Sequence, residues 1–269
     1  MDFNSKTVLI TGGVSGIGKI MVRKSIERGA SKLIIWDIDE IGLEKTKEEF
    51  KYLGDQIYIF KVDISSYEEI IKTAEIVNSQ IGNIDILINN AGIVVGKYFH
   101  EHTHQDINKS MAINADGIIH ITLAFLPNMI TRNSGAICNI CSSAGLISNP
   151  KMSVYAASKW AAIGWSDSLR LEMKQLKKNI SVTTIMPFYI NTGMFDGVQS
   201  KLLPILKPEP TAEKILKAIE RKNKMIAMPL PYWFIRLSQG IMPLSAFEWV
   251  MQHLFGIYDG MKYFKGRTK

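Results

Sequence analysis

The stretch Lys6–Gly18, KTVLITGGVSGIG, decides the fold of this chain. Its apolar first half ends at glycines, which predicts a buried strand followed by a tight turn. The residues after the turn predict a helix over 16–28 that ends at Gly29. Glycines 12, 16 and 18 allow the backbone to approach a pyrophosphate, and the N–H groups that open the helix can then bind the phosphates. A strand, a glycine-rich turn and a helix in this order predict a dinucleotide site.

Strand and helix signals alternate along the chain as far as about residue 229. Further strands are predicted at 33–36, 57–62, 84–88, 136–141, 180–186 and 225–228, and further helices at 40–53, 66–81, 105–131, 153–175 and 212–221. Ser66 is the expected N-cap of its helix. The alternation predicts one α/β domain over 1–229, a Rossmann-type, doubly wound parallel sheet of about seven strands with helices on both faces.

The stretch 230–269 leaves this alternation. It is dense in aromatic side chains, and prolines at 229, 231 and 243 divide it into short helices. Charged residues such as Arg236 and Glu248 interrupt the apolar ones, so we expect an amphipathic helical extension of the same domain. A basic cluster closes the chain and consists of Lys262, Lys265, Arg267 and Lys269. The extension is predicted to cover the substrate cleft or a subunit contact, and secondarily to touch a membrane; the alternative is that it packs on its own subunit and has no further role.

The composition limits the classes of partner. The chain has 269 residues, of which 46% are hydrophobic and 21% charged, enough for one large core. The net charge of +7 is spread along helices, without the basic stripe and stacking aromatics that nucleic acid requires. We therefore expect no nucleic-acid partner, and either a plain solvated basic surface or attraction to anionic lipid. No signal-peptide pattern and no long uncharged apolar run are visible, which favours a cytoplasmic protein.

No metal is expected. Cys138 and Cys141 fall within a predicted strand, which favours buried thiols over a redox or zinc pair. The histidines in the polar stretch 100–104 precede a helix and form no convincing ligand set.

Tyr155 and Lys159 are the candidates for acid/base chemistry. Four residues apart in a predicted helix, their side chains project from one face about one turn apart. A free phenol has a pKa near 10, and a nearby ammonium and the positive ring of a nicotinamide cofactor both favour the phenolate. Lowering the pKa by roughly three units takes about 4 kcal/mol. Ser142, thirteen residues before Tyr155, can donate to a substrate oxygen. These residue types predict an exchange between alcohol and carbonyl with a nicotinamide cofactor.

Two strand-end aspartates refine the cofactor prediction. Asp37 stands nineteen residues after Gly18, where an acidic residue binds the hydroxyls of the adenosine ribose. A carboxylate there repels a 2′-phosphate, so NAD(H) is favoured over NADP(H); the alternative is that Asp37 is a helix N-cap. Asp63 follows the third strand and either meets the adenine edge or serves only as a turn residue.

In combination these motifs resemble the short-chain dehydrogenase/reductase superfamily over about residues 5–230. The glycine turn, Asp63, Asn89-Asn90-Ala91-Gly92, Asn114, Ser142, Tyr155 and Lys159 stand in the family's order and at its spacings. The resemblance implies that Tyr155 is the acid/base, that Lys159 tunes its pKa and contacts ribose, and that Ser142 orients the substrate oxygen. It implies a place for Asn114 in a proton relay and for Asn89 in supporting the cofactor side. The implied cofactor site comprises Gly12, Ser15, Gly16, Ile17, Gly18, Asp37, Asp63, Ile64, Asn90, Ala91, Gly92, Tyr155, Lys159, Pro187 and Thr192.

The later part of the chain is similar to the retinol and hydroxysteroid dehydrogenase branch. The similarity rests on FYINTGMF at 188–195 and LLPILKPE at 202–209. It implies a lipid-like alcohol as substrate. The apolar residues of 193–210 predict a lid over the substrate, or else a packed loop with no substrate preference. Phe188, where most members have glycine, is expected to add apolar surface beside the nicotinamide. The alternatives are a polyol or sugar dehydrogenase and a catalytically silent NAD-binding regulator. The family also implies a homodimer or homotetramer that pairs the helices at 105–131 and 153–175.

Overall fold

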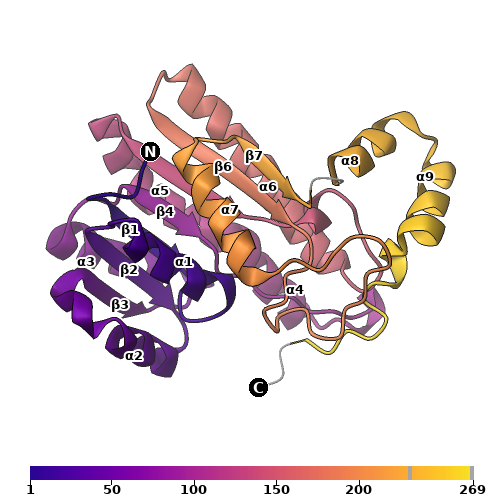
Figure 1. Ribbon diagram of the computed structural model, residues 1–269, viewed down its shortest axis with the longest axis horizontal. Helices are drawn as coiled ribbons and strands as arrows, with labels where there is room; N and C mark the ends of the chain where they lie inside the picture. Colours follow the sequence, from indigo (N-terminus) through magenta and orange to yellow (C-terminus); the bar gives the residue numbers. More distant parts are fainter. Residues whose placement is uncertain (230–231, 267–269) are drawn as a thin grey trace.

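The computed structural model describes residues 1–229 and 232–266 as a parallel sheet covered by helices on both faces (Figure 1). The sheet has seven strands among these residues, in the order β3-β2-β1-β4-β5-β6-β7. Their bounds are β1 Thr7–Thr11, β2 Lys32–Asp37, β3 Ile57–Lys61, β4 Ile86–Asn89, β5 Gly135–Ile140, β6 Ile180–Pro187 and β7 Met225–Met228. The predicted doubly wound sheet is therefore confirmed.

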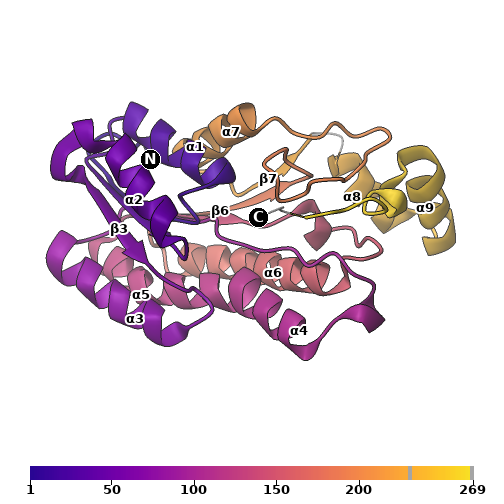
Figure 2. The same ribbon diagram turned by 90° about the horizontal axis from the view of Figure 1, so that it is seen from below.

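The helices form one layer on each face of the sheet (Figure 2). One layer contains α1 Gly16–Glu27, α2 Glu40–Glu49 and α7 Pro208–Glu220, and the other α3 Tyr67–Ile76, α4 His104–Met111, α5 Gly117–Arg132 and α6 Ser153–Gln175. Successive residues of a strand point to opposite faces. Val8 and Ile10 accordingly pack in the core under α1 and α7, whereas Leu9 packs in the core under α5. Burial on both faces explains why the strands are continuous apolar runs.

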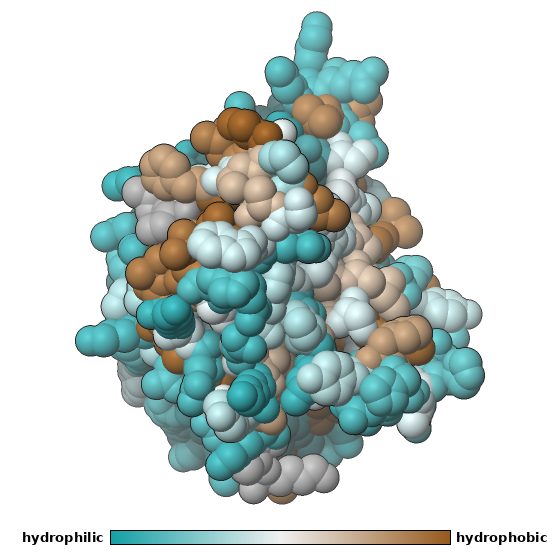
Figure 3. Space-filling model, turned by 90° about the vertical axis from the view of Figure 1, so that its right-hand side faces the viewer, coloured by the Kyte–Doolittle hydropathy of each residue, from teal (hydrophilic) through white to brown (hydrophobic). Residues whose placement is uncertain are grey.

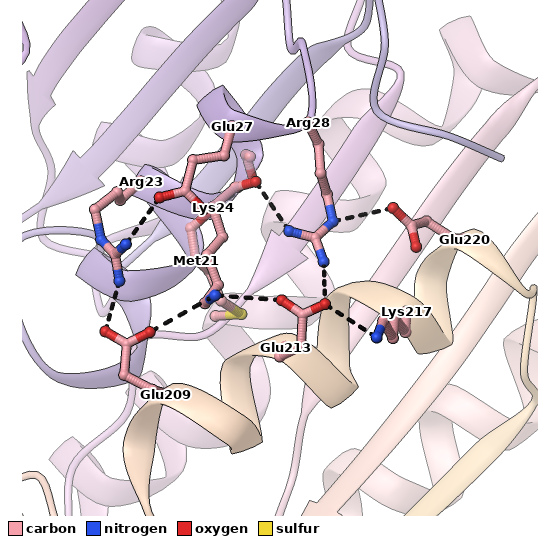
Figure 4. A network of polar contacts seen from close by, with 10 residues as sticks. Met21, Arg23, Lys24, Glu27, Arg28, Glu209, Glu213, Lys217 and Glu220 are labelled. Carbon is pink, nitrogen blue, oxygen red and sulfur yellow. Dashed lines mark hydrogen bonds and ion pairs between the residues drawn. The ribbon is translucent and has the colours of Figure 1, made fainter.

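Helices α1 and α7 are joined by a network of charged side chains (Figure 4). The Arg28 guanidinium donates to Glu213 at 2.7 Å and to Glu220 at 3.0 Å, and Lys24 lies 3.3 Å from Glu213. Arg23 bridges Glu27 and Glu209. The network holds the helix that follows the glycine turn against the helix that follows the predicted lid.

Several predicted helix ends are wrong. The helix predicted over 40–53 ends at Glu49, because Phe50 turns into the core at 3% exposure and a 3₁₀ turn, Lys51–Gln56, follows. The helix predicted over 212–221 begins earlier, at Pro208, where proline fits the first turn and needs no N–H partner. It therefore includes the last three residues of the predicted lid.

Two other predicted helices contain π-helical turns. The helix predicted over 66–81 has Ser66 as its N-cap, as expected, but its last turn, Val77–Ile81, is π-helical. The helix predicted over 105–131 extends over His104–Arg132 and widens into a π turn at Ala112–Asp116. By length and composition, this stretch is the one helix among the described residues that is long and apolar enough to cross a membrane, and half of its apolar 18-residue window is buried inside the protein. The core helix of a globular domain has the same properties.

The C-terminal extension forms short helices, as predicted. They are α8 Tyr232–Ile241 and α9 Leu244–Val250, followed by single turns at Met251–Phe255 and Ile257–Asp259. The extension lies at one end of the sheet, on the right in Figure 1. Pro231 and two members of the predicted basic cluster, Arg267 and Lys269, lie outside the described residues; Lys262 and Lys265 are exposed.

The charge network predicts a specific acid sensitivity. The cations around Glu213 hold its pKa at about 2, below the ordinary 4.5, so its stabilising contribution is complete above pH 4.5 and is lost as the pH falls towards 2. Because solvent screens this carboxylate, we expect Glu213→Gln to cost about 1 kcal/mol of unfolding free energy at pH 7. The cost should shrink at about pH 3.

Urea denaturation at both pH values measures this effect. Glu48→Gln is the matched control, because among the described residues Glu48 forms an ion pair with the exposed Lys51 alone; the substitution should change stability little at either pH. An equal cost of Glu213→Gln at both pH values would show that the network does not hold the helices through charge.

Candidate active site

A cleft of about 260 Å³ opens at the carboxyl ends of the strands. It lies where β1 and β4 are neighbours although they are far apart in the chain, which is the switch point at which doubly wound sheets bind ligands. The cleft brings together every residue of the predicted cofactor site, and Ser142 with them. These lining residues are Gly12, Ser15, Gly16, Ile17, Gly18, Asp37, Asp63, Ile64, Asn90, Ala91, Gly92, Ser142, Tyr155, Lys159, Pro187 and Thr192.

The glycine turn forms one end of the cleft. Gly12 and Gly16 have φ values of +66° and +56°, which other residues rarely adopt. A Cβ atom on Gly18 would lie 1.9 Å from the Gly12 carbonyl oxygen and 2.6 Å from Asn90 Nδ2. Glycine at 18 is therefore required for α1 to pack against the turn. The result is a cradle lined by backbone at a helix N-terminus, which fits a pyrophosphate.

Hydrogen bonds across the switch point hold this cradle. Thr11 Oγ1 accepts from the backbone N–H groups of Asn90 and Ala91, at 3.0 Å each. Asn90 Nδ2 donates to the carbonyls of Thr11 and Gly12, at 2.9 and 3.1 Å. The end of β1 is thus fixed to the segment that follows β4.

Asp37 closes the same end of the cleft. Its carboxylate accepts from Val14 N at 3.2 Å and from Asp39 N at 3.1 Å, so it ties the glycine turn to the end of β2. Burial raises the pKa of Asp37, and these backbone donors oppose the rise. The N-cap of α2 is Asp39, whose side chain accepts from Gly42 N at 3.0 Å. The alternative that Asp37 is the cap is therefore wrong.

Asp63 has contacts that fit both of its predicted roles. Its Oδ1 accepts from the backbone and the hydroxyl of Ser65, at 2.9 and 2.7 Å, which makes it a turn residue after β3. It also lines the cleft, on the side of Asp37.

Tyr155, Lys159 and Ser142 lie buried together at the other end. Tyr155 and Lys159 are each 5% exposed. Lys159 Nζ donates to the carbonyl oxygen of Ile140 at 3.1 Å and lies 5.8 Å from the centroid of the Tyr155 ring. Ser142 Oγ accepts from Ala144 N at 3.1 Å and hydrogen-bonds the Tyr155 hydroxyl.

The expectation that Lys159 lowers the pKa of Tyr155 is not met in the protein alone. Burial raises the pKa of Tyr155 above its ordinary value, and the hydrogen bond from Ser142 opposes this only in part. Burial also lowers the pKa of Lys159, because the ammonium has lost water and donates to a carbonyl in its place. Without a further positive charge in the cleft, Tyr155 is a neutral phenol at pH 7.

Asn114 differs from the other predicted catalytic residues, because it stands behind the cleft wall. Its Oδ1 accepts from Ile93 N, and its Nδ2 donates to Ile93 O and to Ser158 Oγ, at 2.9, 2.9 and 3.1 Å. A Cβ on Gly92 would lie 3.1 Å from Asn114 Oδ1 and 3.6 Å from Lys159 Nζ, so Asn114 stands close to the lysine. Its side chain holds the loop after β4 against α6. Asn89 Nδ2 similarly donates to Thr122 and Asn139 within the core, at 3.1 and 2.9 Å.

Most lining residues that the sequence did not single out are apolar. They are Trp36, Ile38, Val62, Ile93, Ile113, Ile140, Cys141 and Ile190, together with the predicted lid residues Met194 and Phe195. An apolar residue at a strand end is predicted as core, so its sequence carries no separate signal for a cleft. Cys141 follows β5 instead of ending it, and burial raises its thiol pKa to about 11.

Phe188 is a correction to the prediction. It is 6% exposed and packs on Tyr189 with ring centroids 4.4 Å apart, facing a second, small cavity beside Ser142. The apolar surface of the main cleft next to Thr192 comes from Ile190, Met194 and Phe195. Within the described ranges, no group of three or more His, Cys, Asp or Glu side chains is arranged to hold a metal.

The fold and the cleft are those of a dinucleotide-dependent oxidoreductase, and comparisons with known proteins agree. The family model for short chain dehydrogenases matches residues 6–202. The chain is 35% identical over 271 residues to human short-chain dehydrogenase/reductase 3, covering 99% of this chain and 89% of the relative. It is 36% identical over 267 residues to mouse epidermal retinol dehydrogenase 2, covering 97% and 86%. It is 35% identical over 237 residues to human estradiol 17-beta-dehydrogenase 11, covering 88% and 79%.

A solved structure has the same fold. The short chain dehydrogenase/reductase from Burkholderia phymatum, in complex with NAD, superposes with a TM-score of 0.81 at 24% identity, over 89% of this chain and 95% of that one. The chain belongs to the short-chain dehydrogenase family. It is an NAD(P)-dependent oxidoreductase that acts on CH–OH groups, and the predicted similarity to the retinol and hydroxysteroid branch is confirmed.

Gly18→Ala tests whether the cradle depends on a missing side chain. The new methyl group would overlap the Gly12 carbonyl, so we expect a loss of about 1–3 kcal/mol in stability and a clear loss of NADH affinity. Thermal unfolding and NADH fluorescence titration measure the two effects. Gly164→Ala in α6 is the control, because a Cβ atom there would meet nothing within 4 Å; it should be neutral or more stable by up to about 1 kcal/mol. Equal NADH affinity in Gly18→Ala and wild type would contradict the assignment.

Proposed function

We propose that the protein interconverts an apolar alcohol and its carbonyl compound with NAD(H), using Tyr155 as the acid/base. The observation that carries the proposal is the burial of Ser142, Tyr155 and Lys159 at one end of a single cleft whose other end is the glycine cradle and Asp37. A nicotinamide dinucleotide, when bound, supplies the hydride acceptor or donor. The cradle would hold its pyrophosphate, Asp37 the adenosine ribose and Thr192 the nicotinamide carboxamide.

Each side chain at the catalytic end has one task in this proposal. During oxidation the Tyr155 phenolate takes the proton from the substrate hydroxyl, and during reduction the Tyr155 hydroxyl gives that proton to the carbonyl oxygen. Ser142 donates to the substrate oxygen and stabilises negative charge as it develops there. Lys159 contacts the nicotinamide ribose and, once the cleft is occupied, favours the phenolate. Asn114 acts as a positioning residue that keeps the loop after β4 beside Lys159.

The lid supports an apolar substrate. Met194 and Phe195 line the cleft, and the Phe195 ring lies edge-on to Tyr155 with centroids 6.1 Å apart. A retinoid, steroid or other lipid-like alcohol matches this lining and the names of the relatives. The extension braces the lid, because Lys265 N donates to Asp196 O at 2.9 Å and Gln199 N to Gly260 O at 3.0 Å. We therefore treat 230–269 as an extension of the domain 1–229 that helps close the substrate site.

One observation favours a second candidate, a substrate with another hydroxyl group, as in a polyol. Asn149 Oδ1 is buried and has no hydrogen-bond partner among the described residues, while its Nδ2 donates to Tyr189 Oη at 3.0 Å. Both residues line the small cavity that also contains Ser142. A hydroxyl group near the reacting carbon could donate to Asn149 there.

The assembly and location follow the same family reasoning. We propose a homodimer or homotetramer that pairs α5 and α6, whose surfaces expose Leu123 and Leu171 at 64% and 49%. We propose a cytoplasmic enzyme that makes peripheral contact with a membrane through its C-terminal extension.

Tyr155→Phe tests the proposed chemistry. The variant keeps the ring but loses the hydroxyl, so NADH affinity should stay within a few-fold while turnover falls by about 10²–10⁴-fold. NADH formation with retinol, a hydroxysteroid, a long-chain alcohol and a polyol measures turnover, with Tyr67→Phe on the exposed end of α3 as the control. If turnover by Tyr155→Phe stays within a few-fold of that of wild type, Tyr155 is not the acid/base and the proposed mechanism is wrong. A higher kcat/KM for the polyol than for the apolar alcohols selects the second candidate.

Asp37→Ser tests the cofactor preference. Wild type should bind NADH more tightly than NADPH, because the carboxylate repels a 2′-phosphate. In the variant, the dissociation constant for NADPH divided by that for NADH should be roughly tenfold smaller than in wild type, which corresponds to about 1.4 kcal/mol. Asp39→Ser removes the same charge from a neighbouring position yet retains a capping side chain for α2, so its ratio should stay near that of wild type. Tighter binding of NADPH than of NADH by wild type would overturn the assignment.

A further inference from the structure

A small cavity lies beside the catalytic end of the main cleft, and Ser142 lines both spaces. Its volume is about 10 Å³, which is about the room that one water molecule needs. Asn149 Oδ1 is buried at this cavity and has no hydrogen-bond partner among the described residues. One water molecule or one hydroxyl group therefore suits the cavity in size and polarity, whereas a carbon chain or a ring does not fit.

Two aromatic side chains form one wall of the small cavity. Phe188 is 6% exposed, and its ring centroid lies 4.4 Å from that of Tyr189. The Tyr189 hydroxyl accepts from Asn149 Nδ2 at 3.0 Å and donates to Met152 Sδ at 3.8 Å. The backbone holds the same wall, because Phe188 N donates to the carbonyl oxygen of Met228 in β7 at 2.8 Å. Neither ring can move without breaking contacts that are already buried.

Other walls of the small cavity are apolar and equally buried. Met152 is 1% exposed, Ile147 3% and Ile257 5%. Ile257 belongs to the C-terminal extension, which lies on the right in Figure 1 and faces the viewer in Figure 3. Protein interiors are packed as densely as crystals, and forcing extra carbon atoms into them is unfavourable. The small cavity therefore does not widen easily to admit a larger group.

The size of this cavity limits what the reacting carbon of the substrate can carry. In the proposed function the substrate oxygen binds at Ser142 and Tyr155. Besides the hydrogen that is transferred as hydride, the reacting carbon of an alcohol carries two further substituents. One of them has room in the main cleft, under Met194 and Phe195 of the lid. The space beyond Ser142 that remains for the other is the small cavity.

We propose that Phe188 is a specificity-determining residue that restricts the substrate to a primary alcohol and its aldehyde. In a primary alcohol the second substituent is hydrogen, which needs no more room than the small cavity offers. A secondary alcohol, such as one on a steroid ring, needs space there for a second carbon group, and the Phe188 ring fills that space. The inference rests on the proposed function, because it takes the reacting oxygen to bind at Ser142 and Tyr155. It narrows that function, which admits primary and secondary alcohols alike.

Turnover of two isomers tests the size limit. They are a straight-chain primary alcohol and the isomer whose hydroxyl group is on the second carbon, so both are equally apolar. With NAD⁺, the kcat/KM of wild type should be at least about tenfold higher for the primary alcohol, as is typical when a pocket must exclude one carbon group. NADH oxidation with the matching aldehyde and methyl ketone should show the same preference, because both directions share the reacting carbon.

Variants that enlarge the small cavity should weaken this preference. Phe188→Ala should reduce it to within about threefold of unity, because the missing ring leaves space for a second carbon group. Met152→Ala enlarges the cavity from another wall and should weaken the preference as well, so the test does not depend on the folding of one variant. Phe247→Ala is the matched control, because Phe247 is 3% exposed in the same apolar cluster but does not line the small cavity. It should be destabilised in a similar way and keep the preference of wild type.

The outcomes separate the size limit from the proposed function. If wild type oxidises the secondary isomer as well as the primary one, or if the folded cavity variants keep the preference of wild type, the inference is wrong and the proposed function stands. An equal loss of preference in Phe247→Ala would also overturn the inference, because the effect would then come from looser packing in general. If wild type oxidises neither alcohol and reduces neither carbonyl compound, the proposed function is wrong and the inference falls with it.

Discussion

The hydrogen bonds between Thr11 and Asn90 are the contacts on which the site depends. They join the end of β1 to the segment after β4 at the point where the sheet changes its winding direction. With that junction fixed, the carbonyl of Gly12 stands so close to α1 that only glycine fits at position 18. The backbone N–H groups at the start of α1 then face the cleft instead of a side chain. The proposed recognition of the cofactor's pyrophosphate would thus be a consequence of how two strands are tied together.

The burial of Tyr155 and Lys159 is the second constraint. It opposes formation of the phenolate, which the proposed proton transfer requires, as long as no cofactor is bound in the cleft. Tyr155 and Lys159 lie in an apolar wall that raises the pKa of the phenol and lowers that of the ammonium. Both shifts favour the neutral forms, because each group has exchanged water for few polar partners. A positive charge placed beside the phenol in such surroundings acts through a low dielectric and is worth more than in water. The lack of water around Tyr155 therefore has two effects. It raises the pKa of the phenol in the protein alone, and it makes that pKa more sensitive to the charge of a bound molecule.

Much of the fold and the site follows from local sequence. The glycine turn is predictable because it depends on neighbouring residues alone. These residues indicate the strand before the turn and the helix after it, and the glycines allow the positive φ values that the turn needs. The positions of Asp37 and Ser142 are predictable because they stand at or just after the ends of β2 and β5, and parallel strands bring their carboxyl ends to one edge. Tyr155 and Lys159 are predictable as neighbours because four residues of α6 separate them, which places both side chains on one face of the helix. The π turn at Ala112–Asp116 is not, because it depends on its own packing against α6 and on the contacts of Asn114 with Ile93. The end of α2 was not predictable either, because it depends on the burial of Phe50, whereas the charged residues around Phe50 favour a longer helix. Nor was the position of Phe188, which packs on Tyr189 and does not line the main cleft. Phe234, Leu237 and Ile241 have the spacing of one side of a helix, yet only the structure shows that this side of α8 is exposed while Ile235 is buried.

The ionisation of Tyr155 tests the central claim most directly. Ultraviolet difference titration of wild type against Tyr155→Phe isolates this phenol, and it can be repeated with NAD⁺ and with NADH bound. We predict a pKa above the ordinary value of 10.0 in the protein alone. We predict a lower value when NAD⁺, whose nicotinamide ring is positively charged, is present but not when NADH replaces it. A phenol that titrates below 10.0 without any cofactor would contradict the claim that burial governs this residue. So would a titration that NAD⁺ leaves unchanged.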